Sequence, residues 1–343
     1  MDLPASLPAV AARWLDDLLG PQADGTWEEP ASTCGSCARC PAPVGPEAAP
    51  DPPFRPDLKC CMTVPVLANY LVGGALLDPD PAMEPGRQSV RRRIDARFGC
   101  GPLGLSVAPQ LALHHSEARK AGDWGRVPAL VCPHFEAAGG GTCGIWRHRE
   151  AVCTTWFCQV ERGAVGQAVW IALRRLLGCL EAAVARECAR RLGIDGARPG
   201  WGAWLGRVED YYRACAQAAD AIDGRAARRI AGSEASFLTR ELKAALAARD
   251  DDSLPTRLTV GTWEERPARP GTRRLRSWSP WDAVEIDADK LLVLQRFDGR
   301  PVAEVLAALP AAARPDDETL RSWIDHRLLT DPDARRPDDP LRD

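Results

Sequence analysis

Residues 34–158 of this 343-residue chain contain ten cysteines, nine of which fall into two groups, and these nine are the feature that most constrains the chain. The first five form a CxxCxxC motif and an adjacent pair, and the last four are spread over a later stretch. They are Cys34, Cys37, Cys40, Cys60, Cys61, Cys132, Cys143, Cys153 and Cys158. CxxC-type spacing lets thiolates face one ion or cluster, and four thiolates suit either tetrahedral zinc or an iron–sulfur cube.

The alternative is that these nine are incidental thiols or small buried hydrophobic residues. The CxxCxxC segment argues against this, because it lies in a Pro- and Gly-rich stretch without amphipathic periodicity. We therefore predict a thiolate-bound metal centre and favour an iron–sulfur cluster (4Fe-4S) over zinc. Nine thiols allow one site with spare cysteines, or two sites of four with one left over.

The remaining cysteines have a different sequence context. Cys188 and Cys215 fall on apolar helical stripes, and we expect both of them, with the nearby Cys179, to pack in a helical core. Cys100 is a lone thiol in the turn FGCGPLG, and the sequence favours neither role for it.

Charge and hydropathy restrict the partners. The formal net charge is −3, from 44 basic and 47 acidic residues, which does not favour nucleic acid or an anionic membrane surface. We find no uncharged apolar stretch long enough to span a bilayer, and the N-terminal residues lack the pattern of a signal peptide. We therefore expect a cytoplasmic protein without a membrane partner. In the cytoplasm, clustered cysteines more often mean metal or redox chemistry than disulfides.

The second cysteine group resembles a known family. The stretch CPHF–AAGGGTCGIWRHREAVCTTWFC is similar to the YkgJ-type cysteine-cluster family, described as a zinc- or iron-chelating domain. Cys132, Cys143, Cys153 and Cys158 match its late cysteines, and Cys34, Cys37, Cys60 and Cys61 match its early ones. Gly144, Ile145, Trp146 and Arg149 match intervening positions, with Trp146 for the usual tyrosine and Glu150 for the usual proline.

One departure from the family pattern concerns the early cysteines. Family members run from CxxC to CC within a few residues, whereas here about twenty residues and the extra Cys40 intervene. Either Cys37 or Cys40 can therefore be the fourth early ligand. The resemblance covers residues 30–162. It extends to flagellin lysine N-methylases, so the alternative is a cluster-containing enzyme that modifies proteins. The sequence has no S-adenosylmethionine motif and no assignable catalytic residue.

Composition and periodicity predict a mainly α fold with an irregular, loop-rich metal-binding domain, a helical second domain and a small α+β module. The expected segments are an N-terminal helix (1–30), the cysteine-cluster domain (31–162), the helical domain (163–253), a linker with strand character (254–282), the C-terminal module (283–330) and a tail (331–343). The module loosely resembles winged-helix or PqqD-type peptide-recognition modules, through LQRFDGRPVAEVL and SWIDHRLL. That resemblance implies a third function, an adaptor that binds a peptide or protein.

Four polar residues near the cysteines are further candidates. His134 and His148 lie inside the later cysteine segment and could act as auxiliary ligands, although histidines in such positions more often support the ligands than bind the metal. Arg147 and Arg149 flank Trp146 and could offset the negative charge of thiolates. The alternative for both arginines is a place on the surface.

Overall fold

The computed structural model describes residues 7–20, 58, 61–138, 141–157, 160–194, 200–266, 268–279 and 281–333. The chain is mainly helical, which confirms the expected fold class at this level. It forms two compact units. The larger unit comprises Met1–Trp156 and Trp170–Ala244, and the smaller one comprises Phe157–Val169 and Ala245–Asp343.

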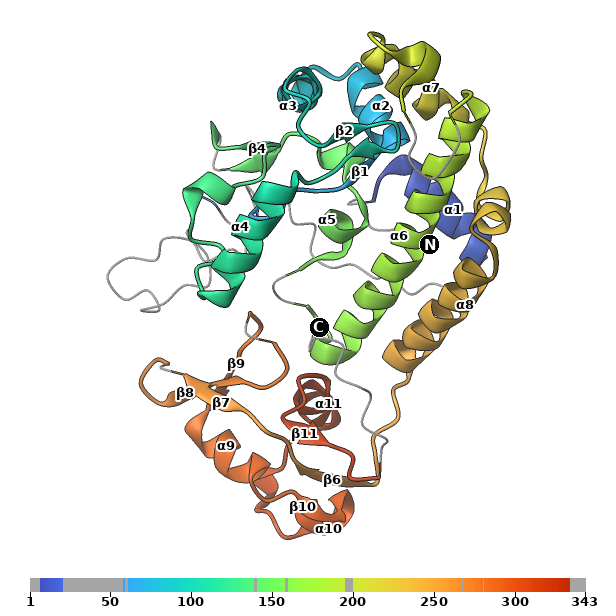
Figure 1. The fold of residues 1–343 in the computed structure, drawn as a ribbon. Helices are drawn as coiled ribbons and strands as arrows, with labels where there is room; N and C mark the ends of the chain where they lie inside the picture. Colours follow the sequence, from blue (N-terminus) through green and yellow to red (C-terminus); the bar gives the residue numbers. More distant parts are fainter. Residues whose placement is uncertain are drawn as a thin grey trace. The chain divides into compact units, whose positions relative to one another are not determined.

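The larger unit combines helices with very short strands (Figure 1). Its first part contains α1 (Ala9–Leu19), β1 (Leu67–Ala68), α2 (Asn69–Leu77), η1 (Pro81–Met83), α3 (Glu84–Asp95), β2 (Cys100–Gly101), β3 (Gly104–Leu105), α4 (Pro109–Lys120), η2 (Pro128–Leu130), β4 (Phe135–Glu136), β5 (Thr142–Cys143), η4 (Trp146–His148) and α5 (Ala151–Thr155). Then follow α6 (Gly163–Arg191), η5 (Gly202–Trp204), α7 (Val208–Asp220) and α8 (Gly224–Asp250). The start of α6, up to Val169, and the end of α8, from Ala245, belong to the smaller unit. The strands form an antiparallel sheet in the order β1-β3-β2 and a separate β4-β5 pair.

Helix α6 forms because its apolar residues recur at helical spacing and can be buried together. Leu173, Leu176 and Leu180 are all fully buried, as the periodicity of the sequence indicates. Helix α8 is not continuous, because Gly232 has non-helical backbone angles, with φ of 75°. Only glycine adopts such a conformation without steric cost, so Gly232 joins two shorter helices.

Helices α2 and α7 approach each other closely enough for their backbones to touch. A Cβ atom added at Gly73 would lie 1.9 Å from the carbonyl oxygen of Tyr212. Asn69, at the start of α2, donates from Nδ2 to the carbonyl oxygens of Pro102 and Ala185 at 3.0 and 2.9 Å. These buried hydrogen bonds connect three distant parts of the chain.

Helix α3 begins earlier than the sequence suggests. The pattern SVRRRIDAR predicts a helix capped by Ser89, but α3 starts at Glu84, with Pro85 in its first turn. Proline suits this position because its missing N–H would have no partner there. Ser89 therefore lies inside the helix and is fully buried, so its hydroxyl is available for a different contact.

The smaller unit contains two three-stranded antiparallel sheets and three short helices. Its elements are β6 (Arg257–Val260), β7 (Glu264–Arg266), β8 (Thr272–Arg276), β9 (Val284–Asp287), α9 (Ala288–Leu294), β10 (Asp298–Pro301), α10 (Val302–Ala307), η6 (Ala311–Ala313), α11 (Asp317–Asp325) and β11 (Leu329–Thr330). The strand orders are β7-β8-β9 and β10-β6-β11. The orange and red part of Figure 1 shows these elements.

Residues 254–282, expected as a linker, share sheets and a core with the module that follows them. Leu258 and Leu275 belong to the same buried cluster as Phe297 and Trp323. The apolar stretch before the Asp298–Gly299 pair forms helix α9. Leu294 is fully buried, which explains why this apolar stretch packs as a helix.

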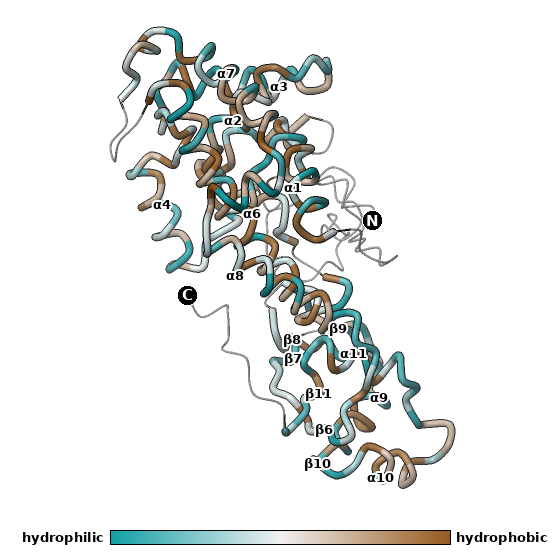
Figure 2. The backbone as a smooth tube through the Cα atoms, turned by 90° about the vertical axis from the view of Figure 1, so that its right-hand side faces the viewer, coloured by the Kyte–Doolittle hydropathy of each residue, from teal (hydrophilic) through white to brown (hydrophobic). Residues whose placement is uncertain are grey.

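Hydrophobic and hydrophilic residues are mixed along the helices of both units (Figure 2). Among the described residues, none of the helices has both the length and the apolar character required to cross a membrane.

Candidate metal centre

Four of the nine cysteines predicted as metal ligands are described in the structure. Cys132 is buried, whereas Cys61, Cys143 and Cys153 are partly buried. The other five predicted ligands lie outside the described residues, namely Cys34, Cys37, Cys40, Cys60 and Cys158.

Cys61 and Cys132 lie side by side although 70 residues separate them in the sequence. The backbone N–H of Cys132 donates to the carbonyl oxygen of Cys61 at 2.8 Å. An apolar cluster holds the two segments together, because Met62 and Leu130, their near neighbours in sequence, are both part of it. One cysteine of the early group therefore lies beside one of the late group.

Cys143 is brought to the same region by the β4-β5 hairpin. Cys143 is the Cα partner of Phe135 across the two strands, and the N–H of Gly144 donates to the carbonyl oxygen of His134 at 2.8 Å. Glycine is needed at Gly86 because a Cβ atom there would lie 1.9 Å from the carbonyl oxygen of Gly144. The hairpin that carries Cys143 thus packs directly on the backbone of α3.

Cys132, Cys143 and Cys153 are close enough to act on one another electrostatically. Burial raises the pKa of the Cys132 thiol to about 12, and the negative charge of a Cys143 thiolate adds to the effect. Burial likewise raises the pKa of Cys153, with further contributions from Glu150, Cys132 and Cys143. Without a cation, the thiols of Cys132 and Cys153 therefore stay protonated at neutral pH.

Glu150 positions Cys153 through the start of α5. Its carboxylate caps this helix and accepts hydrogen bonds from the N–H groups of Val152 and Cys153, at 2.6 and 3.0 Å. Burial raises the pKa of Glu150, although these hydrogen bonds act in the opposite direction. Glu181 of α6 accepts from the N–H of Ala151 at 3.2 Å, which attaches the same turn to the helical core.

Arg149 is buried and joins η4 to α5. Its guanidinium carbon lies 3.4 Å from the centre of the Trp146 ring. Its Nε donates to the carbonyl oxygen of Trp146 at 3.1 Å and its terminal nitrogen to that of Cys153 at 3.0 Å. Of the two arginines that flank Trp146, only Arg147 therefore lies on the surface. Its side chain is 55% exposed and pairs with Asp80 at 2.7 Å.

His134 supports the structure and has no nitrogen left for a metal. It is fully buried, and its Nδ1 lies 2.7 Å from the hydroxyl of Ser89, while its Nε2 lies 3.0 Å from a terminal nitrogen of Arg93. Burial lowers the pKa of His134 to about 3. His134 is therefore not placed as an auxiliary ligand. His148 is hydrogen bonded through Nε2 to Asp78 at 2.9 Å.

Of the three helical cysteines outside the predicted ligand set, two are buried as expected and one is not. Cys188 and Cys215 are fully buried, as their apolar stripes predict. Cys179 is only partly buried, so the prediction that it packs in the core is wrong. It lines a cavity of 420 Å³ between α6 and α8, close to Glu234.

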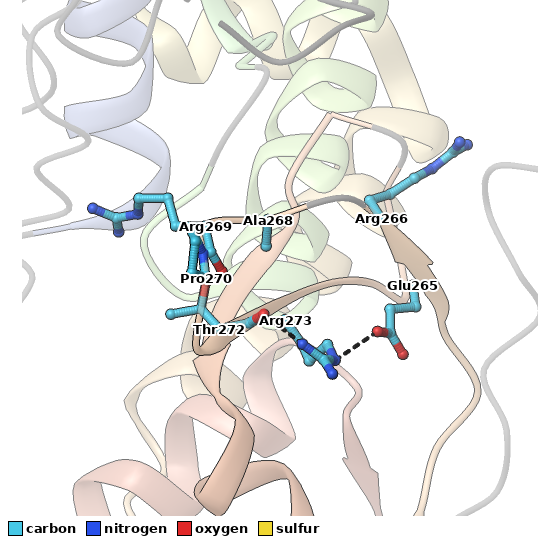
Figure 3. A pocket seen from close by; sticks show the side chains of 7 residues that line it. All are labelled: Glu265, Arg266, Ala268, Arg269, Pro270, Thr272 and Arg273. Carbon is cyan, nitrogen blue, oxygen red and sulfur yellow. Dashed lines mark hydrogen bonds and ion pairs between the residues drawn. The ribbon is translucent and has the colours of Figure 1, made fainter. Parts of the chain in front are cut away.

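A larger cavity in the smaller unit, of 510 Å³, lies at the β7-β8 hairpin. Figure 3 shows that the side chains of Arg266 and Arg269 point away from each other, while Glu265 and Arg273 face each other. The last two form an ion pair at 2.9 Å, and Arg269 is 80% exposed. The guanidinium groups therefore do not converge on one ligand.

Sequence analysis missed the residues that support the cysteines from outside their motifs. Ser89 and Arg93 lie on α3, more than 40 residues before His134, and nothing in the local pattern connects them. The role of Glu150 as a helix cap was predictable from the sequence, because a carboxylate before a short helix is a common N-terminal cap.

Among the described residues, no group of three or more His, Cys, Asp or Glu side chains is already arranged to hold a metal ion. Comparison of the chain with protein-family models, curated proteins and solved structures finds no match. The resemblance to the YkgJ-type family therefore rests on the cysteine motifs alone.

Proposed function

We propose that this protein binds metal through its multi-cysteine cluster, as an iron–sulfur cluster, with zinc as the alternative. The observation that carries the proposal is that Cys132, Cys143 and Cys153, which come from a loop, a strand and a helix, lie close enough to act on one another electrostatically. Thiols that are incidental to a fold have no reason to gather from three separate elements. The approach of Cys61 to Cys132 adds an early cysteine to the same region.

The chemistry of these side chains fits a soft metal. Thiolates are the preferred ligands of both iron–sulfur clusters and structural zinc. Burial opposes ionisation of Cys132 and Cys153, and a bound cation would supply the positive charge that keeps them deprotonated. Reduced thiols are maintained in the cytoplasm, where we place the protein.

The remaining ligands would come from cysteines outside the described residues. Cys60 directly precedes Cys61, and Cys158 follows Cys153 by five positions. Either one could complete a set of four with Cys132, Cys143 and Cys153. A bound metal would also draw the thiols closer together than they are in this structure.

The test is metal analysis of protein purified without oxygen from cells supplied with iron and zinc. We expect a stoichiometric metal content per chain. Brown protein with acid-labile sulfide would indicate an iron–sulfur cluster, and colourless protein with zinc would indicate the alternative. Combined replacement of Cys132, Cys143 and Cys153 by serine should abolish binding.

The matched control is Cys179→Ser, which removes a partly exposed thiol outside the cluster and should leave the metal content unchanged. The proposal fails if wild-type protein contains neither metal. It also fails if the triple variant retains as much metal as Cys179→Ser.

A further inference from the structure

Arg93 is a buried cation in the larger unit. It lies on α3 and is only 3% exposed. One terminal nitrogen donates to the carbonyl oxygen of Ser106 at 2.9 Å, the other lies 3.0 Å from His134 Nε2, and Nε has no hydrogen-bond partner. In the described part of the chain, no carboxylate forms an ion pair with Arg93.

The hydrogen bonds around His134 show that this ring does not neutralise Arg93. A guanidinium only donates, so Nε2 of His134 must accept, and the ring hydrogen must then be on Nδ1. That hydrogen points to the hydroxyl of Ser89, whose own hydrogen goes to the carbonyl oxygen of Gly86 at 2.8 Å. The chain of donors is complete with a neutral histidine, and the positive charge stays on Arg93.

The groups that can offer negative charge to Arg93 are mostly thiols. Arg93 contacts His134, which lies two residues after Cys132 in the sequence. The ionisable side chains that act on the guanidinium of Arg93 are Cys132, then Tyr212 and Cys100. The ring of Phe98, whose centre is 5.7 Å from the guanidinium carbon, offers only a weak cation–π contact. A buried positive charge that no anion compensates is destabilising. Among the described residues no carboxylate compensates Arg93, so its burial needs an explanation.

We propose that Arg93 is the counter-cation of the metal centre and that the centre, with its thiolates, carries net negative charge. This inference rests on the proposed function and adds the electrical character of the site. A divalent zinc ion with four thiolates has a charge of −2, and a four-iron cluster with four thiolates is also anionic. A site with two thiolates and two neutral histidines would be uncharged and would leave Arg93 uncompensated.

The experiment compares three variants of the full chain for metal binding. Arg93→Gln removes the charge and keeps a hydrogen-bond donor, Arg93→Lys keeps the charge, and Arg92→Gln removes a charge from an exposed neighbour on the same helix. Each metal-free protein is titrated anaerobically with Co²⁺, followed by its thiolate-to-cobalt charge-transfer absorption, and the cobalt is then displaced by Zn²⁺. Both steps report thiolate coordination independently of any activity.

We expect Arg93→Gln to weaken metal affinity by about 10- to 100-fold, as loss of a residue that supports metal ligands does. Arg93→Lys should restore most of the affinity, and Arg92→Gln should match the wild type. In protein that contains an iron–sulfur cluster, Arg93→Gln should also make the reduction potential more negative, because an electron is then added without the counter-charge.

Two results would overturn the inference while leaving metal binding intact. One is equal affinity in Arg93→Gln and Arg92→Gln. The other is an equal loss in Arg93→Gln and Arg93→Lys, which would mean that Arg93 acts only through its shape and hydrogen bonds. If the wild type shows no thiolate-to-cobalt absorption, the proposed function itself has failed.

Discussion

Replacing Arg149 by lysine should loosen the turn that carries Cys153. The guanidinium of Arg149 makes hydrogen bonds to the carbonyl oxygens of Trp146 and Cys153 and stacks on the Trp146 ring. Lysine can keep the charge and one of the two hydrogen bonds. The lost charged hydrogen bond contributes about 1.5–3 kcal/mol, and the lost ring contact about 1 kcal/mol or more. We expect local opening to become easier by about 3 kcal/mol, within the range of these two terms.

The assay is hydrogen exchange measured by mass spectrometry on peptides that cover residues 144–157. A change of about 3 kcal/mol corresponds to roughly 100-fold faster exchange through local opening. Local exchange is preferable to a global unfolding curve, because a chain with two compact units does not unfold in a single two-state step.

Arg147→Lys is the matched control for this measurement. Arg147 lies in the same peptides but is exposed, and its ion pair with Asp80 is on the surface. Such pairs contribute about 0–1 kcal/mol, so exchange should change less than about fivefold. If Arg149→Lys and Arg147→Lys give the same exchange rates, the buried contacts of Arg149 do not stabilise this turn.

Three further outcomes follow from the same structure. Gly73→Ala should destabilise the larger unit by about 3 kcal/mol or more, because the added methyl group would overlap a carbonyl oxygen of α7. The control is Gly178→Ala, whose added methyl group would have no neighbour within 4 Å among the described residues outside its own helix, so it should be neutral or raise the melting temperature. Asp325→Asn should lower the stability of the smaller unit by about 2–3 kcal/mol in hydrogen exchange, because it weakens the largely buried ion pair with Arg162. Glu241→Gln breaks a more exposed ion pair and should cost less than about 1 kcal/mol. The metal content per chain should fall as the pH is lowered, because protons compete with the metal for thiolates. Dialysis at a series of pH values, followed by metal analysis, measures this. A metal content that stays constant would argue against thiolate ligation.

The helical part of the fold was predictable because burial and periodicity coincide there. The stripe of α6 that contains Leu173 and Leu180 is buried as expected, and Cys188 follows the same stripe. Cys179 was wrongly placed because it adjoins this stripe in sequence. Consecutive helical residues are about 100° apart around the axis, so Cys179 faces the cavity beside α8 instead of the core.

The surroundings of the cysteines were not predictable, because they depend on contacts between distant parts of the chain. Cys61 meets Cys132 through a backbone hydrogen bond and a shared apolar cluster, and neither has a local sequence signal. The same holds for Arg93 and His134. Motif spacing identifies which thiols belong together, whereas charge compensation and hydrogen bonding become visible only once the chain is folded.

The contacts around the cysteines also bear on how metal and fold depend on each other. Pro- and Gly-rich cysteine segments suggest a region that cannot fold without metal. The structure instead holds Cys132 and Cys143 by contacts that involve no sulfur, namely the buried His134 and the close approach of Gly86 to the β4-β5 hairpin. Cys153 is held in the same way by the Glu150 cap. Because none of these contacts uses a thiol, we predict that metal tightens the arrangement of these three cysteines rather than creates it.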